Sequence, residues 1–210
     1  MAVSGTLSDA RPLLGGQAAD PASAGAGSWK KLLLVLGVYC GVGLLLCGTY
    51  VWGGLSLTHN YSTAVGLWGR IAAPGNEWLL HTYYASILLA ILGFFPALAF
   101  MVQVAPDLPE KSLYTVCGLL LAFYITEMFW IPMCVAYIAK PSKLLFGVIR
   151  VQLAISGILA VCWAVAVCSL PAARTASAGK VLKSVGCAGT VYFAFHCAVL
   201  DALVWPPMFE

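Results

Sequence analysis

The chain has 210 residues, of which 61% are hydrophobic and only 9% are charged, and its formal net charge is +3. A soluble domain carries about 25% charged residues, so this composition excludes an ordinary soluble globular protein and indicates a multi-pass membrane protein. The small net charge and the scattered basic residues argue against nucleic acid as a partner.

The N-terminal segment, residues 1–29, is rich in Ala, Gly, Ser and Pro. Such a composition cannot bury a hydrophobic core, and it predicts a disordered cytosolic tail. The segment lacks the apolar centre of a cleaved signal peptide, so the first apolar run that follows is expected to act as an uncleaved anchor.

Within this tail, Asp9 is followed four and five positions later by Leu13 and Leu14. The pattern resembles the acidic dileucine sorting signals of endosomal and lysosomal membrane proteins. The resemblance covers six residues, and it implies that a cytosolic sorting adaptor seats the two leucines in an apolar pocket. The alternative is a tail that carries no signal.

Five long apolar runs follow the tail, and each is long enough to cross a membrane as a helix, which takes about 20 residues. The sequence therefore predicts an all-α fold in which residues 30–210 form a bundle of five transmembrane helices. The predicted helices cover residues 32–54, 78–104, 113–138, 144–170 and 184–206.

The positive charges predict an orientation, because cytoplasmic segments of membrane proteins are enriched in Lys and Arg. With the N-terminus in the cytosol, seven of these residues lie in cytosolic segments and three lie outside. The C-terminus is then luminal or extracellular. Asn60, in the sequon Asn60-Tyr61-Ser62, falls in the first outer loop, where it is a candidate for glycosylation. Together with the tail motif, this orientation favours an endosomal or lysosomal membrane, with the plasma membrane as the alternative.

Cysteine and histidine do not form a metal-binding pattern in this sequence. All eight cysteines lie inside the apolar runs, none forms CxxC, and the three histidines are not spaced near them like zinc ligands. The cysteines are interpreted as small apolar side chains packed between helices, and no metal or cofactor is expected.

Small residues recur at a spacing of four in three of the predicted helices, which lets helices approach closely where lipid supplies no hydrophobic drive. They are interpreted either as packing within the bundle or as a face for a second copy or a membrane partner. The positions are Gly37 and Gly41, then Ser156, Ala160, Ala164 and Cys168, and finally Ala194, Ala198 and Ala202.

Five ionisable side chains fall inside the predicted spans, where such residues are rare, costly and often functional. A rise of about 1.5 Å per residue places all five in the outer half of the bundle or at its floor. They are expected to line one polar cavity that opens to the lumen. The five are His81, Glu127, Arg150, His196 and Asp201.

The charges within this set can balance one another. Arg150 is always protonated and needs a counter-charge, so it is expected to pair with Glu127 or Asp201. His196 and Asp201 are five residues apart, about 140° around an α-helix, so they are expected to face different neighbours rather than each other. An ion pair that only fixes the register of two helices is the structural alternative.

Trp130 and Pro132 lie close to Glu127 on the third predicted helix. Pro132 removes one backbone hydrogen bond, which predicts a kink beside the carboxyl group. A tryptophan beside a carboxylate suits a ligand with a flat apolar body and one polar or cationic end.

Three functions stay open from these features. The first is binding or transport of a small lipid-like or amphipathic molecule. The second is a membrane-embedded, lipid-modifying enzyme that transfers protons like an isomerase, although the sequence contains no HExxH, GxSxG or CxxC motif. The third is an accessory subunit of a larger membrane complex. The expected ligand-binding residues are His81, Glu127, Trp130, Arg150, His196 and Asp201.

Overall fold

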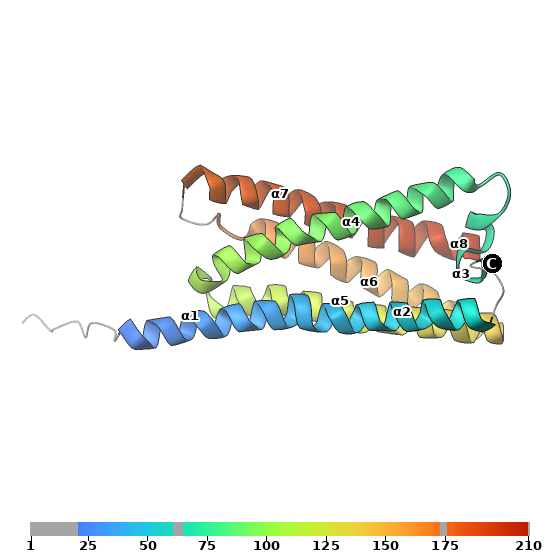
Figure 1. Cartoon of the computed structure of the whole chain (residues 1–210), viewed down its shortest axis with the longest axis horizontal. Helices are drawn as coiled ribbons and strands as arrows, with labels where there is room; N and C mark the ends of the chain where they lie inside the picture. The colour runs from blue at the N-terminus through green and yellow to red at the C-terminus, as the bar shows by residue number, and fades with distance from the viewer. Residues whose placement is uncertain (1–20, 61–64, 173–175, 210) are drawn as a thin grey trace, which may run out of the picture.

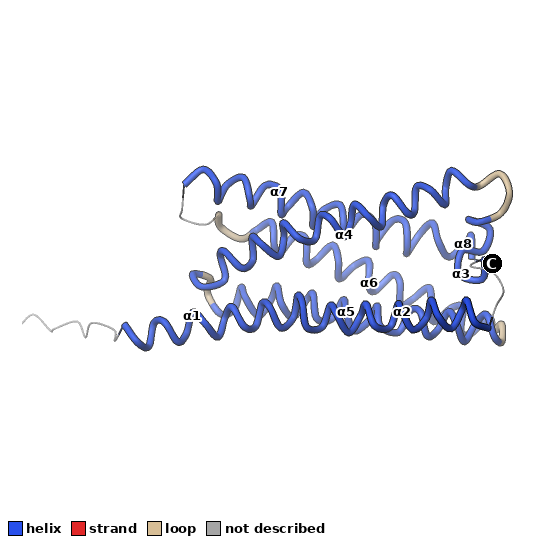
Figure 2. The backbone as a smooth tube through the Cα atoms, in the orientation of Figure 1, coloured by secondary structure: helices blue, strands red, loops and turns tan. Residues whose placement is uncertain are grey.

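The computed structural model describes residues 21–60, 65–172 and 176–209. Within these ranges the secondary structure is entirely helical, and no strand occurs (Figure 2). The all-α prediction is therefore confirmed for this part of the chain. The tail motif of Asp9, Leu13 and Leu14 lies outside the described residues.

The helices follow one another with short connections, and two of them contain π-helical segments, in which the backbone bonds run from residue i to i+5. In chain order the elements are α1 (Pro21–Leu36), the π-helix η1 (Gly37–Val42), α2 (Gly43–Asn60), α3 (Val65–Trp68), the 3₁₀-helix η2 (Gly69–Ala72), α4 (Glu77–Val104), the 3₁₀-helix η3 (Ala105–Asp107), α5 (Glu110–Ala139), α6 (Lys143–Ser169), α7 (Ala176–Phe195), the π-helix η4 (His196–Val204) and α8 (Trp205–Phe209).

Five helical stretches of the described residues are long and apolar enough to cross a membrane, as the sequence predicts. Each matches one predicted run to within a few residues at either end. They are Gly27–Leu57, Glu77–Asp107, Glu110–Ala139, Lys143–Ser169 and Gly179–Phe209. Helix α1 already begins at Pro21, so residues 21–29, expected as tail, belong to the first helix. Helices α4 and α5 both continue through their internal prolines, Pro96 and Pro132.

The long helices lie roughly along one another in a bundle, with α4 packed along α7 and α5 along α6 (Figure 1). Small residues make these contacts possible. A Cβ atom on Gly93 of α4 would lie 2.8 Å from the Cα of Gly189 on α7. A Cβ atom on Gly157 of α6 would lie 2.9 Å from the Cα of Ala198 on η4. Glycine at these positions is therefore required by the closeness of the two backbones.

Some of the small-residue stripes are buried between helices, and one faces outward. Ser156, Ala160 and Ala164 are buried on α6, as is Ala194 on α7, and these helices pack on each other. Their stripes therefore serve packing within the bundle. Gly37 and Gly41 of η1 face outward, with no atom within 4 Å of a Cβ placed on either.

The buried core has two apolar clusters, one towards each end of the bundle. The cluster near η3 includes Phe100, Leu113 and Trp163, and the cluster near α8 includes Tyr83, Ile149 and Trp205. Five buried polar side chains lie in and beside the gap between them, and we call these the polar layer. Its members are Ser86 on α4, Glu127 on α5, Gln152 and Ser156 on α6, and His196 on η4.

Polar contacts fix the helices to one another at both ends of the bundle. At the η3 end, the Lys31 ammonium donates hydrogen bonds to the carbonyls of Leu108, at 2.6 Å, and Pro106, at 3.3 Å. At the other end, the Trp205 indole N–H donates to the Leu67 carbonyl at 3.0 Å. The Arg70 guanidinium donates to the Pro207 carbonyl nearby. These contacts join the helices on both sides of the polar layer.

Candidate functional site

Glu127 is the centre of the candidate site. It lies near the middle of α5 and is 6% exposed. The Tyr50 hydroxyl of α2 donates a hydrogen bond to its Oε2 atom at 2.8 Å. The whole Tyr50 side chain is 36% exposed, yet its hydroxyl points inward to the carboxyl group. The first and third long helices are therefore joined by a polar contact inside the bundle.

Tyr50 was missing from the residues expected from the sequence. It carries no charge in the neutral range, and it lies among apolar residues of α2 that cover every side of the helix. The only signal for Tyr50 in the sequence is its hydroxyl group within an apolar run, because a buried tyrosine usually forms a hydrogen bond through that group.

Arg150 does not pair with Glu127 or Asp201, which corrects the expected ion pair. It is exposed, and its guanidinium lies 6.0 Å from the centre of the Phe146 ring. The inward-facing side of α6 here is formed by Ile149, Leu153 and Ser156, whereas Arg150 lies on another side. A long arginine side chain at this position reaches out of the bundle instead of being buried.

His81 also lies outside the site. It is exposed, whereas Tyr83 and Ser86 of the same helix are 1% and 3% exposed. Two residues correspond to about 200° of rotation around a helix, so His81 and Tyr83 face nearly opposite directions. Ser86, which carries no charge, takes the place in the site that the sequence assigned to His81.

The side chains of His196 and Asp201 are in contact, which corrects the expectation that they face different neighbours. The His196 Nε2 atom lies 3.5 Å from the Asp201 Oδ2 atom, and no other ion pair occurs among the described residues. Both residues belong to the π-helix η4. In a π-helix, residue i+5 lies one turn beyond residue i, so a spacing that separates two side chains on an α-helix brings them together here.

A chain of hydrogen bonds leads to this pair from α4 and α7. The Tyr192 hydroxyl donates to Ser86 Oγ at 3.0 Å, and Ser86 Oγ lies 2.9 Å from His196 Nδ1. Because Ser86 Oγ accepts from Tyr192, its own proton is free to go to His196 Nδ1. The other ring nitrogen, Nε2, then carries the proton that faces Asp201.

A second group of hydrogen bonds joins α5 to α6 beside Glu127. The Gln152 amide donates to the Thr126 carbonyl at 2.9 Å and to Ser156 Oγ at 3.0 Å. Ser156 Oγ in turn donates to Thr126 Oγ1 at 2.9 Å. Two buried polar atoms have no hydrogen-bond partner among the described residues, Gln152 Oε1 of this network and Trp130 Nε1.

Aromatic rings surround the Glu127 side of the site. The Trp130 ring centre lies 5.6 Å from that of Tyr50 and 5.5 Å from that of Trp205. Trp130 was expected at the site, and it lies there, between a ring that binds Glu127 and a ring of α8. The site therefore joins a carboxyl group to three aromatic side chains.

The two acidic side chains belong to one region of the bundle. Glu127 lies within electrostatic range of Asp201, and Asp201 lies within that range of Tyr50. Neither pairs with a lysine or an arginine of the described residues. No group of three His, Cys, Asp or Glu side chains that could hold a metal ion occurs there either. The site thus holds two acidic side chains that contact no lysine or arginine of the described residues.

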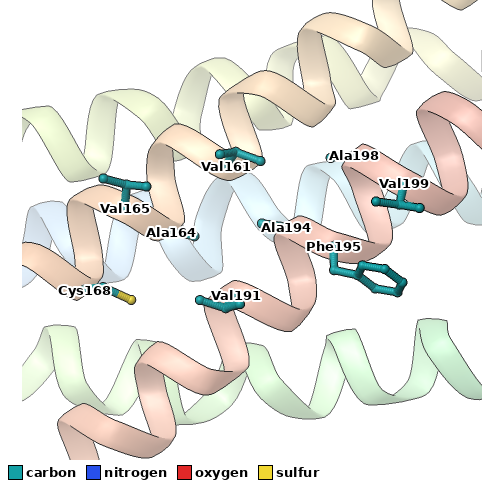
Figure 3. Close-up of a pocket in the computed structure, with 9 residues that line it drawn as sticks. All are labelled: Val161, Ala164, Val165, Cys168, Val191, Ala194, Phe195, Ala198 and Val199. Atoms are coloured by element: carbon teal, nitrogen blue, oxygen red, sulfur yellow. The ribbon is translucent and has the colours of Figure 1, made fainter.

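A shallow groove of about 340 Å³ runs between α6 and α7 (Figure 3). Its lining is apolar and includes Val161, Ala164 and Ala198. None of the lining residues belongs to the polar layer, so this groove is not the polar cavity expected from the sequence. The polar side chains instead bind one another between the helices.

Asn60 is the last residue of α2. The rest of its sequon, Tyr61 and Ser62, lies outside the described residues, so its glycosylation stays a prediction.

Comparison with known proteins adds no assignment: no protein-family model, no curated protein and no solved structure matches this chain.

Proposed function

We propose that this chain is a multi-pass membrane protein that binds or transports a small amphipathic molecule with a flat apolar body and a cationic end. The observation that carries the proposal is the pair of acidic side chains, Glu127 and Asp201, held inside a helical bundle without a lysine or arginine partner. Ionisable residues in such positions are costly, which favours a functional reason for their presence.

The charge of the site selects a cation. A buried carboxylate without a counter-charge costs several kcal/mol. Glu127 is 6% exposed and Asp201 is partly buried, so a cation bound beside them offsets that cost. Arg150 is exposed and does not supply the charge. A ligand that brings its own positive end is therefore favoured over an anion or a neutral lipid.

The aromatic rings select the body of the ligand. Tyr50, Trp130 and Trp205 form a contiguous set, with centre-to-centre distances of 5.6 and 5.5 Å. Aromatic faces attract cations and stack on flat apolar groups. Trp130 Nε1, which has no partner among the described residues, adds a hydrogen-bond donor at the same place.

The proposal keeps the orientation and compartment favoured by the sequence. The N-terminus is cytosolic, the polar layer is reached from the luminal side, and the Asp9, Leu13 and Leu14 signal directs the protein to endosomes or lysosomes. Proteolysis of a tag on either terminus in sealed vesicles tests the orientation. Microscopy of the Leu13→Ala, Leu14→Ala variant tests the compartment.

Binding is tested on the full chain in lipid nanodiscs with two probes of similar shape, the flat permanent cation N-methylquinolinium and the neutral 1-methylnaphthalene. We expect quenching of tryptophan fluorescence to show tighter binding of the cation. In Glu127→Gln the Kd of the cation should rise by about tenfold or more, because a charge-assisted contact contributes about 1.5–3 kcal/mol.

The matched control is Arg150→Gln, which changes a charge at similar depth outside the site and should leave the Kd unchanged. Equal binding of the cation by Glu127→Gln and the wild-type protein would remove the case for this site. Equal affinity for the charged and the neutral probe would show that the site does not select cations.

A membrane-embedded enzyme that transfers protons is the second candidate. The observation that favours it is the contact of Ser86, His196 and Asp201, because a histidine held between a hydroxyl and a carboxyl group is suited to general acid–base catalysis. Lipid extracts of cells that lack the protein discriminate between the two functions. One accumulated precursor indicates an enzyme, whereas unchanged lipid species with altered distribution indicate a carrier.

A further inference from the structure

We propose that the site exchanges one proton for the cationic end of its ligand, with His196 and Asp201 holding the proton. This inference rests on the proposed function and adds the coupling ion to it. Its starting point is geometric: the hydrogen-bond chain from Tyr192 through Ser86 to His196 ends at Asp201.

The chain is suited to both protonation states of His196. With a neutral ring, Ser86 donates its proton to Nδ1, and Nε2–H faces Asp201. With a charged ring, Nδ1–H donates to Ser86 Oγ, which retains an acceptor position because a hydroxyl oxygen has two lone pairs. Gain or loss of a proton at His196 therefore breaks no hydrogen bond on the Ser86 side.

The two ends of the chain are less buried than its middle. Tyr192 and Asp201, the two ends of the chain, are only partly buried, whereas Ser86 is 3% exposed and His196 is 8% exposed. The middle of the chain is thus buried, and both of its ends reach the surface of the bundle. A proton that enters at Tyr192 reaches Asp201 when each hydroxyl or ring nitrogen passes one proton to the next group and receives one from the group before it.

The groups that face the pair come from every neighbouring helix. Besides Ser86, α4 presents Tyr83, whose ring centre lies 6.4 Å from that of His196 and whose hydroxyl donates to the Leu200 carbonyl. From α5 comes Glu127, and from α2 comes Tyr50. Buried side chains of α6 beside this region, Gln152 and Ser156, do not titrate.

The exchange balances charge. Without a ligand, a proton held by His196 or Asp201 compensates part of the acidic character of the site. When the cation binds between the carboxyl groups, that proton leaves along the chain through Ser86 and Tyr192, so the net charge inside the bundle stays the same. When the cation leaves, a proton returns by the same path.

The test is the pH dependence of N-methylquinolinium binding to the full chain in nanodiscs, since this probe carries no exchangeable proton. We expect its Kd to rise as the pH falls, by up to about tenfold per pH unit when one proton competes with one cation. Asp201→Asn should flatten this dependence. Ser86→Ala should shift it along the pH axis, and Ser86→Thr should restore the wild-type profile.

A wild-type Kd that does not change with pH would overturn the proton exchange and leave the proposed function standing. If the wild-type protein does not bind the cation at any pH, the proposed function fails, and infrared difference spectroscopy of the ligand-free protein still tests the proton site. We expect a pH-dependent carbonyl band of a protonated carboxyl group that is lost in Asp201→Asn. Spectra of Asp201→Asn and of His196→Gln that both match those of the wild-type protein would overturn the inference.

Discussion

His196 and Asp201 are five residues apart in the sequence, yet their side chains meet at 3.5 Å between Nε2 and Oδ2. The contact exists because both residues belong to a π-helical segment, in which a residue and the fifth one after it lie one turn apart. Such segments often occur at functional sites, since they re-aim side chains within an otherwise regular helix. Here the segment joins the histidine to the carboxyl group and leaves Ser86 on the other side of the ring.

The contact between Tyr50 and Glu127 predicts a cost for removing the hydroxyl. Tyr50→Phe leaves Glu127 without its donor at 2.8 Å, and a buried polar group that loses its partner costs about 1–3 kcal/mol. We expect a lower thermal unfolding midpoint in detergent, measured by near-UV circular dichroism. Tyr114→Phe is the matched control, because Tyr114 is 58% exposed on the same helix as Glu127. Equal midpoints for both variants would contradict a stabilising role of the contact.

The close approach of α4 and α7 predicts that Gly189 does not tolerate a side chain. In Gly189→Ala the new Cβ atom would meet the Gly93 backbone, and forced overpacking typically costs about 1–3 kcal/mol or more. We expect a clear loss of thermal stability. Gly118→Ala is the control, because nothing lies within 4 Å of its added Cβ and alanine favours a helix over glycine by about 1 kcal/mol. The two substitutions should therefore have opposite signs.

The contacts of Lys31 are expected to stabilise the η3 end of the bundle. Its ammonium donates to the carbonyls of Leu108 and Pro106, and hydrogen bonds from a charged donor contribute about 1.5–3 kcal/mol. Lys31→Met should lower the unfolding midpoint and expose the connection between η3 and α5 to limited proteolysis. The same change at its exposed neighbour Lys30 should alter neither. Faster cleavage in both variants would point to lost charge instead of lost contact.

The exposed position of Arg150 predicts that it is independent of Glu127. Arg150→Gln should change stability by less than about 0.5 kcal/mol, as expected for a surface substitution. The double variant with Glu127→Gln should show the sum of the two single effects. A coupling free energy above about 0.5 kcal/mol in this double-mutant cycle would contradict this independence and support the ion pair expected from the sequence.

The sequence by itself determined the number of long helices and their positions. Apolar runs of this length leave no other way to satisfy their backbone groups in lipid, so length and composition are enough. The sequence also singled out Glu127, His196 and Asp201 as candidate site residues, because ionisable side chains are conspicuous in apolar runs, and their role stays a prediction.

Only the tertiary structure decided which side chains meet. Apolar residues cover nearly every side of these helices, so the pattern does not say which side of α4 or α6 faces inward. The rotation of each helix, set by packing against its neighbours, turns Ser86 and Gln152 inward and His81 and Arg150 outward. The switch from α- to π-helical bonding in η4 likewise has no signature in residue spacing, and it alone brings His196 to Asp201.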